Sequence, residues 1–130
     1  MLNESEMLQA LSFFEGKPEE HALFLRLTEL LSERFPEITM RVQKTQITFS
    51  NRYGFAFVSL PRRKQPRPAI LVSFGLGFRL DSPRIFQAAE PYPGRWTHHV
   101  LVSAPEELDS ELLDWLGAAY AFSAAKGRKT

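Results

Sequence analysis

Residues 95–120 read RWTHHVLVSAPEELDSELLDWLGAAY, and they join a strand pattern to a helix pattern in one stretch. Apolar and polar residues alternate from Arg95 to Ser103, which predicts a β-strand. The segment 103–106 that follows has a capping serine and an early proline, the composition of a helix N-terminus. The helical apolar stripe then consists of Leu108, Leu112, Trp115, Leu116 and Ala119. We therefore expect the rest of the chain to pack against this strand and helix.

Two more helices are predicted ahead of the strands. Asn3 can cap the first helix, with Glu6 as its capping-box partner. The apolar stripe of this helix consists of Leu8, Leu11 and Phe14. The second helix begins at Pro18, because proline suits the first helical turn, and it ends at Arg34. Its apolar positions are Leu23, Phe24, Leu27, Leu30 and Leu31.

The apolar spacing changes to a period of two at Ile38, which indicates strands. The predicted strands are 38–43, 46–50, 55–60, 69–74 and 95–103. Residues 81–94 contain three prolines and no clear period, so we expect a long irregular loop there. This order predicts an α+β fold with a mostly antiparallel sheet of about five strands, two N-terminal helices and one C-terminal helix. A single domain is expected over 1–124, followed by a disordered basic tail at 125–130.

The predicted strands 55–60 and 69–74 carry apolar residues on both faces. A sheet with one solvated face would alternate apolar and polar residues instead. Three arrangements would cover the second face: helices on both sides, a sheet curled around its own pocket, or a homodimer through that face. The sequence leaves the three open.

Composition excludes several classes of protein. The 130 residues include no cysteine, so disulfides and thiolate metal ligands are ruled out. The N-terminus has no signal-peptide pattern and no stretch is apolar enough to span a membrane, so we expect a cytoplasmic protein. The net charge is only +1, but residues 38–103 hold ten basic and two acidic side chains. The predicted sheet is therefore basic and the predicted helices are acidic.

Six short segments together resemble a known family. Residues 95–100 (RWTHHV) are followed by Glu107-Leu-Asp109, by 112–116 and by Ala118-Ala-Tyr120. Upstream, 44–49 followed by 53–58 looks like the same family's lysine-then-strand segment. The chain thus resembles domain of unknown function 5655, a bacterial family, over roughly residues 18–124. The resemblance implies one compact domain and no assigned reaction.

The adjacent His98 and His99 cannot ligate one metal ion, because neighbouring side chains in a strand point to opposite faces. His98 shares its face with Trp96 and Val100, which predicts a core histidine, whereas His99 is predicted at the surface. The alternative makes one of the two a pocket ligand or a general base. No hydrolase elbow, dinucleotide fingerprint or metal-binding spacing is present, so we predict no catalytic residue, no cofactor and no metal ion.

These features favour a non-enzymatic binding or interaction module. Its pocket is expected between the sheet and the 81–94 loop, and its ligand would be a small molecule. The predicted lining residues are Lys44, Arg95, Trp96, His98 and Tyr120.

The alternative is a nucleic-acid-binding domain that uses the basic region 41–67. Lysine and arginine on one sheet and its loops would neutralise phosphates, and this contribution to binding depends on salt. The residues predicted to contact nucleic acid are Arg41, Arg52, Arg62, Arg63, Lys64 and Arg67.

Overall fold

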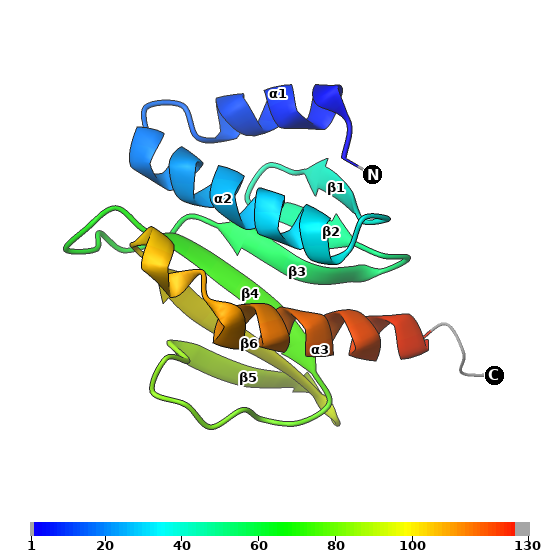
Figure 1. The fold of residues 1–130 in the computed structure, drawn as a ribbon. Helices are drawn as coiled ribbons and strands as arrows, with labels where there is room; N and C mark the ends of the chain where they lie inside the picture. The colour runs from blue at the N-terminus through cyan, green and yellow to red at the C-terminus, as the bar shows by residue number, and fades with distance from the viewer. Residues whose placement is uncertain (1, 127–130) are drawn as a thin grey trace.

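The strands between residues 39 and 102 form one antiparallel sheet in a computed structural model of the chain, which describes residues 2–126. Two helices precede the sheet and one follows it (Figure 1), so the predicted α+β fold is confirmed. The helices are α1 (Glu4–Phe13), α2 (Pro18–Arg34) and α3 (Ser110–Lys126). The strands are β1 (Thr39–Val42), β2 (Ile47–Ser50), β3 (Gly54–Ser59), β4 (Ile70–Leu76), β5 (Gln87–Tyr92) and β6 (Arg95–Val102). Their order in the sheet is β1-β2-β3-β4-β6-β5.

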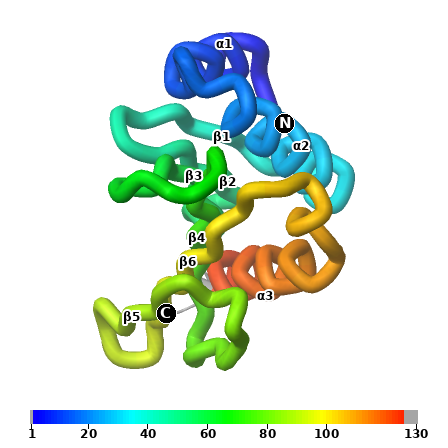
Figure 2. The backbone as a smooth tube through the Cα atoms, turned by 90° about the vertical axis from the view of Figure 1, so that its left-hand side faces the viewer, coloured from blue at the N-terminus to red at the C-terminus, as the bar shows by residue number. Residues whose placement is uncertain are grey.

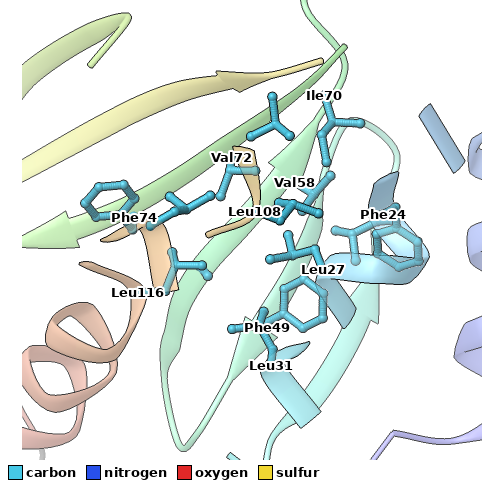
Figure 3. Close-up of a cluster of buried hydrophobic side chains, with 14 of the residues drawn as sticks. Phe24, Leu27, Leu31, Phe49, Val58, Ile70, Val72, Phe74, Leu108 and Leu116 are labelled. Carbon is cyan, nitrogen blue, oxygen red and sulfur yellow. The ribbon is translucent and has the colours of Figure 1, made fainter. Parts of the chain in front are cut away.

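The core lies between one face of the sheet and the helices α2 and α3, which lie on the same side of the strands (Figures 1 and 2). The predicted stripe of α2 is buried except at Leu30, which is half-buried, and Phe24, Leu27 and Leu31 are each fully inaccessible. They meet Phe49 of β2 and Val58 of β3 in the cluster that Figure 3 shows. Burying this much apolar surface is the main favourable contribution to folding.

Helix α1 presents a different face to the protein from the one its sequence suggested. Leu8 and Leu11 are 63% and 55% exposed, whereas Ala10 and Phe14 are buried. The predicted stripe is therefore wrong at two of its three positions. The physical reason is that α1 packs mainly against the edge strand β1, so the contact with that strand decides which side is covered.

The cap of α1 is partly as predicted. Asn3 accepts the Glu6 amide at 2.8 Å and caps the helix. The Glu6 carboxylate does not complete a capping box; it accepts the amide of Val42 in β1 at 2.8 Å. One carboxylate thus ties α1 to an edge strand that would otherwise expose this donor.

The 81–94 segment is not wholly irregular, because it contains β5. This strand pairs only with β6, through a hairpin whose turn is Pro93 and Gly94, the latter at φ +76°. Its register shifts between Ala89 and Tyr92, which accommodates Pro91. An edge strand needs no buried face and tolerates proline at a bulge, so its sequence lacks the alternation that predicts strands.

The start of α3 also differs from its prediction. Residues Pro105–Glu107 form a single 3-10 turn, and the α-helix begins at Ser110. Glu107 accepts the amides of Ser103 at 2.6 Å and Ala104 at 3.2 Å, so its carboxylate caps the short turn. Asp109 then accepts the Leu112 amide at 3.1 Å. Two carboxylates therefore serve the two successive helix starts where one serine was expected.

Residues 125 and 126 belong to α3, and the remainder of the predicted basic tail lies outside the described residues. No helix in the described part of the chain has the length and hydropathy that crossing a membrane requires.

Helices α2 and α3 both leave the second face of the sheet open (Figure 2), and the end of α1 borders it at Ser12 and Phe13. The apolar residues on both sides of β3 have two separate causes. Phe49 pairs with Ala56 and Ser50 pairs with Gly54, so Phe55 is the extra residue of a bulge. Phe55 packs into the core against Phe35 and Tyr120, at ring distances of 5.8 and 5.2 Å. The remaining apolar residues, Phe57 of β3 and Leu71 of β4, lie on the second face of the sheet and are half-buried there.

Candidate functional site: a basic groove on the open face of the sheet

The open face of the sheet carries a groove of about 1050 Å³. Its floor comes from residues that alternate with the core positions: Ser59 of β3, Leu71 of β4 and His99 of β6. The loop between β3 and β4, which reaches away from α2 and α3 in Figure 2, forms one wall. The full lining is Ser12, Phe13, Lys44, Thr45, Gln46, Ser59, Leu60, Pro61, Arg62, Arg63, Gln65, Leu71, Phe86, Gln87 and His99.

The charged residues of this lining are all basic. They are Lys44, in the turn between β1 and β2, with Arg62 and Arg63 in the β3–β4 loop. No aspartate or glutamate is in the lining, and none of these three cations forms an ion pair within the described residues. Cations that lack acidic partners give a groove a positive potential, which low-dielectric walls strengthen.

The groove also has an apolar part. Phe86 is 58% exposed, and its amide donates to the His99 carbonyl at 2.7 Å, which holds this segment beside β6. Phe13, Leu60 and Leu71 add further apolar surface. The site therefore offers charge and apolar contact together, as pockets for organic ligands usually do.

The two histidines lie on opposite faces of β6, as their adjacency predicts. His98 is fully buried in the core, stacks on Phe74 at 5.2 Å, and accepts the Leu80 amide at Nε2 over 2.8 Å. Burial lowers its pKa, so the ring is neutral at neutral pH. His98 therefore holds the β4–β5 connection in place and does not reach the groove.

The five residues predicted to line a pocket do not share one site. Lys44 lines the groove, whereas His98 is in the core on the other side of the sheet. Trp96 belongs to the His98 face and lies under the Arg79 guanidinium at 5.8 Å. Tyr120 is on α3 and stacks on Phe35 at 4.3 Å. Arg95 is at the start of β6, opposite Tyr92.

The residues of the nucleic-acid alternative are also divided. Arg62 and Arg63 line the groove, and they also line a smaller hollow of about 510 Å³ with Lys64 and Arg67. Arg67 donates to the Ser103 hydroxyl at 3.1 Å. Arg41 is exposed on β1, and Arg52 is in the turn before β3, at the opposite end of that strand from the basic loop.

Several groove residues were missed from the sequence. Phe86 and Gln87 lie in a segment with no periodic pattern, and Gln65 lies in a loop. Ser73 is beneath the floor, and only the register that pairs it with His99 brings it to the site. An alternating polar position in an otherwise apolar strand was the one signal that pointed to Ser73.

Arg84 fixes the segment that carries Phe86. Its Nη1 donates to Asp109 at 2.9 and 3.1 Å and to Glu111 at 2.9 Å, and its Nη2 donates to the Glu107 carbonyl at 2.7 Å. The guanidinium also lies 5.7 Å from the Trp115 ring. The Leu112 amide and Arg84 together lower the pKa of Asp109. The groove wall is thereby tied to the start of α3.

Arg84→Ala should lower the free energy of unfolding by about 2 kcal/mol, because hydrogen bonds to charged groups are worth about 1.5–3 kcal/mol. Urea denaturation monitored by circular dichroism would measure the change. The matched control is Arg26→Ala, whose exposed pair with Glu29 should contribute no more than about 0.5 kcal/mol. Equal losses in the two variants would contradict the anchoring role.

A family model for domain of unknown function 5655 matches residues 10–123. The chain belongs to this family. No curated protein and no solved structure matches it. The DUF5655 domain thus covers α2, the whole sheet and nearly all of α3, and it includes every groove residue. No group of three or more potential metal-ligating side chains occurs in residues 2–126 of this DUF5655 chain.

Proposed function

We propose that this DUF5655 chain is a cytoplasmic, non-enzymatic binding module whose groove takes an organic anion of the phosphate type. The observation that carries the proposal is the charge of the groove: three cations and no acidic residue line it. Arginine and lysine bind phosphate oxygens through charge-assisted hydrogen bonds, which are about twice as strong as neutral ones. Three cations match a multiply charged group better than a single carboxylate.

The size and the apolar wall support an organic ligand in place of a bare inorganic ion. A volume of about 1050 Å³ is at the upper end of the usual range for small-molecule sites. Phe86, on the segment 81–94 that was expected to border the pocket, offers an exposed ring at one side. The homodimer predicted through this face stays a prediction.

Single-stranded nucleic acid is the second candidate ligand. The observation that favours it is the continuation of positive charge beyond the groove, since Lys64 and Arg67 are exposed in the same loop as Arg62 and Arg63. Phe86 could stack on a base, which is worth about 1–3 kcal/mol per base. Such binding would weaken steeply with salt.

Amide chemical-shift mapping on the uniformly labelled full chain would test the proposal. The probes are trimetaphosphate, a small trianion, and a single-stranded oligothymidylate, each added at low and at moderate salt. We expect trimetaphosphate to shift the amides of Lys44, Arg62, Arg63 and His99 and to leave those of α3 unchanged. No shift at millimolar probe would refute the proposal. Binding of the oligonucleotide alone, with a steep salt dependence, would favour the second candidate.

A further inference from the structure

His99 is held in one orientation on the floor of the groove. Its Nδ1 lies 2.6 Å from the hydroxyl oxygen of Ser73, the residue directly opposite it in β4. Ser73 is only 6% exposed, so this hydroxyl is not available to a ligand. The bond instead fixes the ring and determines which nitrogen faces the groove.

The other ring nitrogen is open to the groove. Nε2 of His99 has no hydrogen-bond partner within residues 2–126. Nε2 of His99 is also accessible. Within the described residues, the fully buried side-chain polar atom without a hydrogen-bond partner is Nδ1 of His98, so the unpartnered Nε2 of His99 is not fully buried. A half-buried imidazole in a site wall with one nitrogen bound and the other free is arranged to meet a ligand.

The Ser73 hydroxyl supports both protonation states of the ring. A hydroxyl donates one hydrogen bond and accepts others. It can therefore donate to Nδ1 of neutral His99, or accept from the Nδ1–H of the imidazolium. In these two arrangements Nε2 carries a proton and is a donor toward the groove. It is a neutral donor at high pH and a cationic donor at low pH. In the third arrangement, the neutral tautomer whose Nδ1–H donates to Ser73, Nε2 is an acceptor, so an oxyanion at Nε2 selects the first two.

The charged groups that face His99 are Lys44, from the β1–β2 turn, and Arg62 and Arg63, from the β3–β4 loop. The neighbouring strands contribute only uncharged residues, Ser73 and Leu71 from β4 and Gln87 from β5. Burial lowers the pKa of His99, so the ring is neutral in the empty groove at neutral pH. An anion placed at Nε2 would raise that pKa, because a nearby negative charge favours the imidazolium.

We propose that His99 is the central anion-binding residue of the groove, where its Nε2–H donates to a phosphate-type oxyanion held by Lys44, Arg62 and Arg63, and that binding is accompanied by proton uptake at His99. This inference rests on the proposed function and adds the residue that selects the ligand. By linkage, binding is strongest where His99 is protonated in the complex and weakens as pH rises above that range. Ser73 is its positioning residue.

Isothermal titration of the full chain with trimetaphosphate tests the inference. This probe keeps its charge of −3 between about pH 5.5 and pH 8, so any change in affinity comes from the protein. We expect binding about threefold to tenfold tighter at pH 5.5 than at pH 8, where tenfold is the limit that one unit of pKa change at His99 can produce. The binding enthalpy should also vary with the ionisation enthalpy of the buffer, since protons are taken up.

His99→Gln should bind weakly and with little pH dependence, and His21→Gln, which changes a histidine outside the groove, should behave like the unchanged chain. Ser73→Ala should weaken binding about threefold while proton uptake remains. His99→Asn serves if the glutamine variant fails to fold, as judged by circular dichroism. Absence of binding by the unchanged chain at both pH values would refute the proposed function itself. Binding with the same pH dependence in the unchanged chain and in His99→Gln would overturn only the role of His99.

Discussion

Replacing Phe24 by alanine should lower the free energy of unfolding by about 3–5 kcal/mol, the range for removing a phenylalanine from a packed core. Phe24 is fully buried on α2, and its ring lies 5.2 Å from that of Phe14 and 6.2 Å from that of Phe49. It therefore joins the end of α1 to β2 through α2. Removing it leaves a cavity among aromatic rings that cannot easily move inward.

Urea denaturation of the purified unchanged chain and of the Phe24→Ala variant would measure this loss of unfolding free energy. The matched control is Leu25→Ala, at the next position of the same helix, where the side chain is 40% exposed. Leu25→Ala should change the free energy of unfolding by no more than about 0.5–1 kcal/mol, because exposed side chains contribute little packing. A Phe24→Ala loss no larger than that of the control would show that the core is not packed as described. An unfolded Phe24→Ala variant would agree with the prediction, since a small domain has only about 5–15 kcal/mol in total.

The double substitution Arg62→Glu with Arg63→Glu should reduce trimetaphosphate affinity by at least about 100-fold. Each lost charge-assisted contact is worth about 1.5–3 kcal/mol, and the introduced carboxylates repel the anion. Both residues line the groove from one loop, and both are exposed, so the fold should be unaffected. Titration calorimetry at pH 6 would give the two affinities.

The control for this experiment is Arg26→Glu with Arg52→Glu, which changes the net charge by the same amount at exposed positions outside the groove. Its affinity should stay within about threefold of the unchanged chain, because separated surface charges are screened by salt. Equal losses in the two double variants would mean that the anion senses net charge and not the groove. The double substitution Lys64→Glu with Arg67→Glu distinguishes the two candidate ligands, since it should reduce the affinity for an oligonucleotide more than the affinity for trimetaphosphate.

The sequence predicted the parts of the fold that rest on strong periodic patterns. The stripe of α2 and the alternation in β6 predicted their buried faces, because each pattern covers enough residues to exclude other arrangements. Adjacency alone placed His98 and His99 on opposite faces of the sheet, and the structure puts His98 in the core. The family resemblance was also carried by these segments and is confirmed over residues 10–123.

Short or exposed elements depended on their neighbours. The stripe of α1 has only three apolar residues, and contact with β1 decided which of its sides is buried. Strand β5 has a single partner and an exposed sequence, so pairing with β6 defines it. At α3, the 3-10 turn of Pro105–Glu107 and the capping carboxylates of Glu107 and Asp109 place the start of the α-helix at Ser110.

The candidate site shows the same division. The sequence by itself determined that the sheet region is basic, that one histidine would leave the core, and that the second face of the sheet needed an explanation. Only the tertiary structure decided that Lys44, Arg62 and Arg63 line one groove with His99, and that the Ser73 hydroxyl lies against the His99 ring. The physical reason is that composition and the spacing of apolar residues determine the structure of a single segment, and they do not determine which separate segments come into contact. The groove depends instead on strand register and on two loops that come together from separate parts of the chain.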